Sequence, residues 1–195
     1  MRVLDRRVLP VPVYLVLIMC ATKEYTADMH RTRYAAWAAS RAIGRGASGI
    51  STARVFRAME RVDLEGRLKT TVFSSRAAYD KWHVGMVERI QKAAVSEGMQ
   101  LTFGLASKVL AIHIKTLHII VGKRKDLLRF AHPPVDRIVL KKGLPKDLRN
   151  NLTLLGWTHF SREDYRRVFK ALEEHVLDSN QPRWKIEACW MNEFL

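Results

Sequence analysis

Two residues with catalytic potential lie in the stretch Leu101–Gly143. Lys108 stands near the start of an apolar segment that follows Gly104, and Asp136 directly precedes a short helical segment closed by Gly143. A lysine becomes a nucleophile near neutral pH only when burial or nearby positive charge lowers its pKa. A carboxylate held beside a carbon that develops positive charge stabilises that charge. Lys108 and Asp136 are therefore the candidate catalytic pair.

Each residue also has a plain structural interpretation. Asp136 follows a stiff Pro-Pro segment and is well placed to be the N-cap of the next helix. Lys108 shares a helix face with Ile112 and Lys115, and it could simply be a solvated lysine. If the two residues act together, their side chains should lie within about 7 Å of each other, because both must approach one reacting centre.

The order of Gly, Lys, an apolar helix and Pro-Val-Asp resembles the helix-hairpin-helix DNA glycosylase superfamily. Lys108 matches the catalytic lysine of that family, and Pro134-Val135-Asp136 matches its Pro-Val-Asp. The spacing is most similar to the archaeal 8-oxoguanine glycosylase branch. The resemblance implies an all-α, two-lobed helical bundle whose active site lies in the cleft between the lobes, and a double-stranded DNA partner that contains a damaged or modified base.

The chain also resembles a group of uncharacterised bacterial proteins of similar length, over segments that include YAAWAASR at 34–41 and WKIEACW at 184–190. Two departures from the glycosylase pattern stand out. Ala106 replaces the second glycine of the usual Gly-x-Gly, where a turn of positive φ would disfavour alanine. The family's four-cysteine iron–sulfur motif cannot form from Cys20 and Cys189, so no metal or other cofactor is expected.

Residues for DNA contact and for base binding follow from this interpretation. The expected DNA contacts come from the hairpin and from the densest basic cluster: Gly104, Ser107, Lys115, Lys123, Arg124, Lys125, Arg129, Arg137, Lys141 and Lys142. A base flipped out of the duplex needs an aromatic or apolar sandwich. The candidates for that pocket are Trp82, Phe103, His132, Trp157 and Trp184.

The net charge of +15 over 195 residues indicates a polyanionic partner. A basic but merely solvated surface is the alternative, and an acidic membrane surface is a weaker one, because no long helix separates basic from apolar residues cleanly. Two distant cysteines argue against a disulfide framework and favour a reducing, cytoplasmic location. We expect a monomer without membrane attachment.

Residues 1–28 form an N-terminal extension of uncertain status, and residues 29–195 form a single helical domain. Arg6-Arg7 and the apolar run that follows resemble a signal peptide, but the run is too short for a membrane span and contains two prolines. A start codon at Met19 or Met29, or an N-terminal strand packed on the core, explains the segment better than a signal peptide does.

Hydrophobic periodicity and capping residues predict seven or eight helices. Helices are expected over 31–45, 52–61 and 76–96, then from just after Gly104, where the far end of the apolar segment could equally be a strand. A capping box at Ser161 opens another helix, and a last one starts at Pro182. Residues 62–74 are expected to form a loop, and 144–151 a turn-like segment.

Three functions remain open from the sequence. The first is a DNA glycosylase that excises a damaged or modified base, in base excision repair or in defence against modified foreign DNA, with AP-lyase activity if Lys108 forms a Schiff base. The second is a non-catalytic DNA-binding module on the same scaffold. The third is an RNA-binding or ribosome-associated basic protein.

Overall fold

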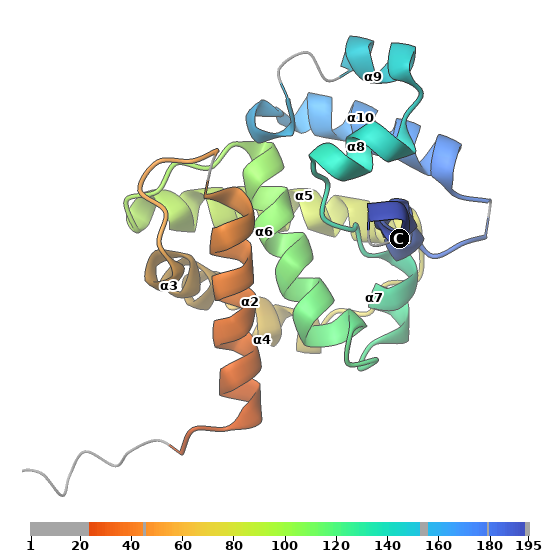
Figure 1. Ribbon diagram of the computed structural model, residues 1–195. Helices are drawn as coiled ribbons and strands as arrows, with labels where there is room; N and C mark the ends of the chain where they lie inside the picture. The colour runs from red at the N-terminus through yellow and green to blue at the C-terminus, as the bar shows by residue number, and fades with distance from the viewer. Residues whose placement is uncertain (1–23, 45, 153–155, 179, 194–195) are drawn as a thin grey trace, which may run out of the picture.

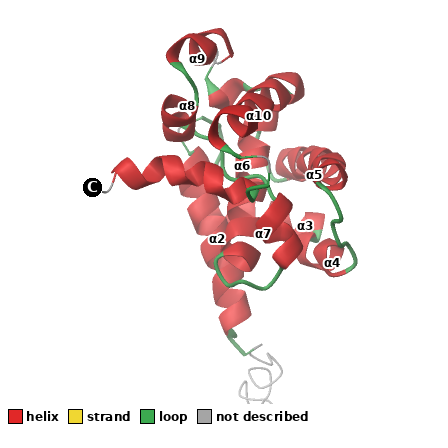
Figure 2. Ribbon diagram, turned by 90° about the vertical axis from the view of Figure 1, so that its right-hand side faces the viewer, coloured by secondary structure: helices red, strands yellow, loops and turns green. Residues whose placement is uncertain are grey.

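The computed structural model describes residues 24–44, 46–152, 156–178 and 180–193, and their secondary structure is helical throughout (Figures 1 and 2). Within these ranges no helix is both long and apolar enough to cross a membrane. The helices, in chain order, are α2 (Ala27–Ile43), α3 (Thr52–Val62), α4 (Leu64–Lys69), α5 (Arg76–Ser96), α6 (Phe103–Ile114), η1 (Lys115–Ile119), α7 (Lys125–Phe130), α8 (Arg137–Gly143), α9 (Lys146–Leu152), η2 (Trp157–His159), α10 (Arg162–Val176) and η3 (Arg183–Glu193).

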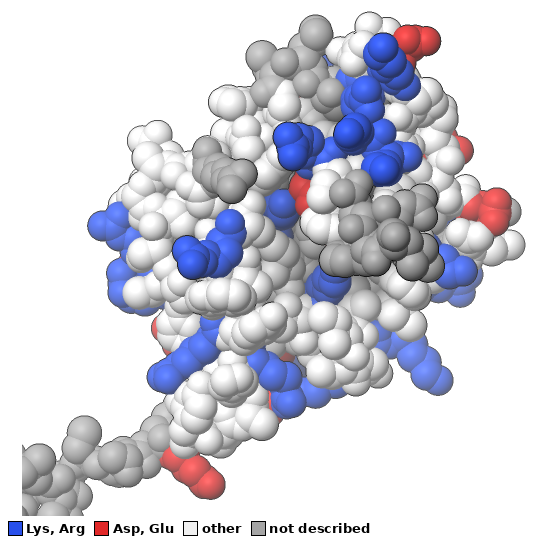
Figure 3. All heavy atoms as spheres, viewed as in Figure 1, with Lys and Arg blue, Asp and Glu red and all other residues white. Residues whose placement is uncertain are grey.

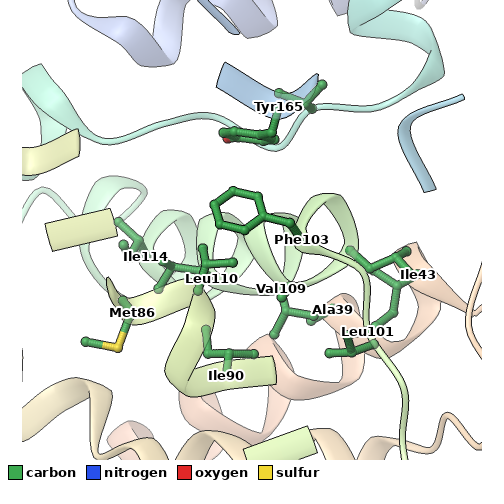
Figure 4. Packing of buried hydrophobic residues seen from close by; sticks show 14 of the residues in the cluster. Ala39, Ile43, Met86, Ile90, Leu101, Phe103, Val109, Leu110, Ile114 and Tyr165 are labelled. Carbon is green, nitrogen blue, oxygen red and sulfur yellow. The ribbon is translucent and has the colours of Figure 1, made fainter. Parts of the chain in front are cut away.

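Helix α6 is the central element of the core. It packs against α2 and α5, and more lightly against α10, so its apolar residues are covered on several sides (Figure 1). Figure 4 shows Val109, Leu110 and Ile114 of α6 among side chains of α2 and α5, while Phe103 points toward Tyr165 of α10. A helix enclosed in this way must be apolar nearly all round, which makes a lysine in its middle exceptional.

The predicted helix starts are confirmed by their caps. Ser51 and Ser75 accept hydrogen bonds from backbone N–H groups of α3 and α5. Ser161 forms the predicted capping box with Asp164 at the start of α10. Thr102 caps α6, where its side chain accepts a hydrogen bond from the N–H of Leu105 at 3.2 Å. These side chains satisfy N–H groups that a helix start leaves without backbone partners.

Two predicted segments differ from the structure, and a third, which was left open between helix and strand, is helical. Residues 64–69 form the helix α4 in the expected loop, with Asp63 in the left-handed region at φ 50° as its N-cap. The turn-like segment 144–151 contains most of α9. The far end of the apolar segment remains helical and becomes the π-helix η1. The first two elements are short polar helices, whose periodic signal spans too few residues to be recognised.

The N-terminal boundary also shifts. Helix α2 begins at Ala27 rather than at 31, with Thr26 as its cap, so the expected boundary at residue 29 falls inside the helix. The proposals made for residues 1–23 lie outside the described residues.

The turn between α5 and α6 lies at Gly98, whose φ is +71°, and not at Gly104. Gly104 and Ala106 are both inside α6, and neither has a positive φ. Alanine at 106 therefore causes no strain. Gly104 is instead required for packing, because a Cβ there would collide with the carbonyl oxygen of Trp157.

A buried charge cluster fixes the C-terminal helix η3 to the rest of the domain. Arg183 is 2% exposed, and it donates to Glu173 of α10 at 2.7 Å and to Asp80 of α5 at 3.0 Å. Asp80 also contacts His132 Nε2 at 2.8 Å. Because a buried charge is tolerated only when it is paired, these contacts hold η3 and the segment before α8 in fixed positions.

Candidate active site

Lys108 and Asp136 meet in the structure. The Lys108 Nζ donates to Asp136 Oδ2 at 3.4 Å, well inside the expected 7 Å. Both side chains are largely buried, with 8% of the Lys108 side chain and 14% of the Asp136 side chain exposed. A distance of 3.4 Å is long for a charge-assisted hydrogen bond, so the amine is held near the carboxylate without a short, optimised bond to it.

Asp136 uses its two oxygens for two purposes. Oδ1 accepts hydrogen bonds from the N–H groups of Ile138 and Val139 at 2.9 and 3.0 Å, which makes Asp136 the N-cap of α8 as predicted. Oδ2 faces Lys108. The cap and the site are therefore compatible, because the capping bonds fix the carboxylate in the orientation that presents its second oxygen to the amine.

Burial lowers the pKa of Lys108, because desolvation penalises the ammonium form, while the negative charges of Asp136 and Glu187 act in the opposite direction. The ring of Trp157 also faces the amine, with its centroid 4.2 Å from Nζ, and an aromatic face attracts a cation. Burial is the largest of these effects, so the pKa of Lys108 is lower than that of a solvated lysine.

Glu187 is the ionisable residue of this site that sequence reasoning missed. It lies on η3, and its carboxylate accepts a hydrogen bond from Lys115 at 2.7 Å. Burial raises the pKa of Glu187, with Lys115 acting in the opposite direction. Lys115 lies seven residues after Lys108 on one helix face, so the two ion pairs lie along the same side of α6 and η1. The sequence signal was a lone carboxylate in the apolar segment WKIEACW.

A hollow of about 430 Å³ opens beside Trp157 and the start of α8, and two of its basic lining residues are Arg137 and Lys141. Figure 3 shows Lys and Arg side chains gathered over α8 and α9 in the upper part of the molecule. This surface adjoins the Lys108 site, because Trp157 lines the hollow and contacts Lys108, and Asp136 directly precedes Arg137. It is the best placed surface for phosphates near the candidate pair.

Four of the expected DNA contacts have structural roles instead. Gly104 is packed against Trp157, and its N–H donates to the carbonyl of Phe160 at 3.1 Å. Ser107 is fully buried. Arg124 donates hydrogen bonds to Asp126 and to the backbone carbonyls of Leu68 in α4 and of Thr71 just after it, at 2.5–2.8 Å. Lys115 pairs with Glu187.

The remaining cations are on the surface. Lys123 lies near Asp28 of α2 at 3.4 Å, and about half of its side chain is exposed. Lys125, Arg129, Arg137, Lys141 and Lys142 are exposed. The basic cluster predicted from the sequence is therefore partly used inside the fold, and its accessible part is concentrated at α7 and α8.

The five aromatic candidates do not form one pocket. Only Trp157 contacts Lys108. Trp82 packs on Phe73 and lines a separate hollow with residues of α4 and α5. Phe103 and His132 belong to a buried aromatic group around Tyr165. Trp184 is 36% exposed on η3. Single sequence positions could not show which aromatic residues share a cavity.

Replacing Lys108 with Met should leave the free energy of unfolding unchanged or raise it by about 1 kcal/mol at pH 7. The variant removes a buried amine, and Asp136 keeps its two backbone N–H bonds, so no charge is left without hydrogen bonds. Urea unfolding would measure the change. Lys115→Met is the control and should destabilise, because it strips the buried Glu187 of its partner. A loss above about 2 kcal/mol for Lys108→Met would mean that the ion pair holds the fold together.

Comparisons with models of protein families, with curated proteins and with solved structures find nothing that matches this chain.

Proposed function

We propose that the protein is a DNA N-glycosylase that excises a damaged or modified base, with Lys108 as nucleophile and Asp136 as the stabilising carboxylate. The observation that carries this proposal is the contact of a buried lysine of lowered pKa with a carboxylate fixed by a helix start. A lysine in the middle of a core helix costs stability. A chemical role for the pair, rather than a stabilising one, accounts for its presence.

The reaction follows from these two groups. As the bond between base and sugar breaks, the base leaves with the electron pair and positive charge develops at C1′, which the carboxylate of Asp136 stabilises. The neutral amine of Lys108 forms a bond to C1′. The C1′–O4′ bond then breaks and O4′ takes the proton that the amine loses, which leaves a Schiff base and permits strand cleavage by β-elimination. If the amine stays protonated, water attacks instead and an abasic site remains.

Access to the bond requires a flipped nucleotide, because C1′ cannot reach a buried amine while the base is stacked in the duplex. Trp157 is the aromatic side chain at the amine, and we assign it to the wall that the flipped nucleotide meets. The cations at α8, including Arg137 and Lys141, would hold the flanking phosphates. Base release from duplexes with single modified bases, read as alkali-sensitive strand breaks, tests the proposal.

Glu187→Gln should move the acid limb of the pH–rate profile to lower pH. The negative charge of Glu187 raises the pKa of Lys108. Its removal lowers that pKa further, so the amine loses its proton at lower pH. Single-turnover base release measured from pH 5 to 9 would show the shift. Glu174→Gln, at an exposed position of α10, is the control and should not move the profile. A shift to higher pH, or none, would contradict the role of Lys108 as a neutral nucleophile.

A further inference from the structure

Two large aromatic side chains are exposed on α2, outside the site described above. Tyr34 is 51% exposed and Trp37 is 48% exposed, and their ring centroids are 5.6 Å apart with the planes tilted by 32°. Arg33 and Arg41 are exposed on the same side of the helix, four residues before and after Trp37. We call these four residues the α2 aromatic face. Contiguous exposed apolar surface, unlike single exposed apolar residues, marks interaction sites when it is extensive.

The stretch of sequence that carries this face is basic, although two of its arginines are paired, Arg31 with Asp28 and Arg57 with Glu97. From Met29 to Met59 the sequence contains six arginines and no aspartate or glutamate, namely Arg31, Arg33, Arg41, Arg45, Arg54 and Arg57. The acidic residue of α2, Asp28, lies at the other end of the helix and is paired with Arg31 and Lys123. The partner that complements this surface is therefore an anion with flat apolar groups.

The α2 aromatic face continues into a hollow of about 740 Å³, which is lined by Trp37, Ser40, Arg41, Gly44, Ala47 and residues 49–52. The segment of chain that lines this hollow also contacts η2. A Cβ on Gly46 would lie 2.6 Å from Thr158 Cγ2, so the segment after α2 packs directly on η2. Trp157, the neighbour of Thr158, faces the amine of Lys108.

We propose that the α2 aromatic face binds single-stranded DNA, with unpaired bases stacked on Tyr34 and Trp37 and phosphates on the neighbouring arginines. Exposed rings flanked by cations bind unpaired bases because every base has a stacking face and every nucleotide a negative charge. Bases in an intact duplex are already stacked on each other, so this face selects unpaired segments. An acidic protein would match the arginines but would supply no flat partner for both rings.

The test compares two labelled twelve-residue strands with the full-length protein by fluorescence anisotropy. One strand is oligothymidylate, and the other has the same number of phosphates but tetrahydrofuran residues throughout, which lack both a base and the aldehyde that Lys108 would attack. Stacking predicts that the thymidine strand binds at least about tenfold tighter at equal salt, and that Trp37→Ala removes this preference. Trp37→Phe should keep most of it, since a ring remains. Val72→Ala, at an exposed apolar residue outside α2, is the control.

Equal affinity for the two strands, or an unchanged preference in Trp37→Ala, would overturn the proposal. So would sedimentation data in which Trp37→Ala turns a dimer into a monomer while strand binding stays intact, because the face would then be a contact between copies of the chain. The strands contain no modified base and the assay needs no turnover. A failure here therefore leaves the proposed glycosylase activity untouched, and a failure of base release leaves this proposal untouched.

Discussion

Lys108→Gln should reduce single-turnover base release on the order of 10³- to 10⁴-fold, the loss seen when a nucleophile or its partner is removed from a catalytic group. Glutamine has a similar length but cannot form a Schiff base or attack C1′. The amine is buried against Asp136 and Trp157, so it contributes little to the binding of phosphates. Affinity for duplex DNA, measured by anisotropy, should therefore stay nearly unchanged.

The matched control for this variant is Lys170→Gln. Lys170 is a solvated lysine of α10 whose side chain is 76% exposed, and its loss should leave the rate unchanged. Retained base release in Lys108→Gln would remove the residue from the mechanism. If neither this variant nor Asp136→Asn changes any DNA-dependent property, the protein is better described as a DNA-binding module that lacks the reaction.

Asp136→Asn should slow base release about 10²- to 10³-fold, the usual effect of removing one group that stabilises transition-state charge. Asparagine is as good an N-cap as aspartate, so α8 should keep its start and the unfolding free energy should change little. The loss of the carboxylate also lowers the pKa of Lys108 further. The variant therefore has a more easily deprotonated lysine and lacks only the stabilising charge.

Asp136→Ala separates the two roles of this residue. Its base release should slow by the same factor as in Asp136→Asn. Its free energy of unfolding should also fall by about 1 kcal/mol, because the N–H groups of Ile138 and Val139 lose their acceptor. Chemical denaturation of both variants beside the wild type gives this comparison. An Asp136→Asn protein that releases base as fast as the wild type would show that the carboxylate acts only as a cap.

The sequence supported the prediction of an all-α protein, because periodicity and capping residues are strong local signals, whereas the meeting of Lys108 with Asp136 was predicted from the resemblance to the glycosylase superfamily. The caps Ser51 and Ser161 correctly predicted the starts of α3 and α10. Asp136 follows a stiff Pro-Pro segment, and this position favours a helix start at Asp136. The two-lobed glycosylase architecture was predicted from the resemblance alone, and it remains a proposal.

The sequence could not show how the other site residues are used, because their environment depends on contacts between distant segments. Arg124 reads as a surface cation, yet it binds Asp126 and backbone carbonyls near α4. Gly104 reads as a phosphate-binding glycine, yet it makes room for Trp157. Glu187 reaches Lys115 across 72 positions of sequence. Such pairings are set by packing and leave no periodic or local pattern.

The most direct measurement is borohydride trapping of the purified protein on labelled duplexes that carry single oxidised, deaminated, alkylated or hypermodified bases, with alkali cleavage run in parallel. The proposed mechanism predicts a covalent adduct on at least one duplex, lost in Lys108→Gln, together with alkali-sensitive breaks at the modified base. Breaks without an adduct would keep the glycosylase and transfer the attack from Lys108 to water. Neither an adduct nor a break on any of these duplexes would contradict the proposed activity.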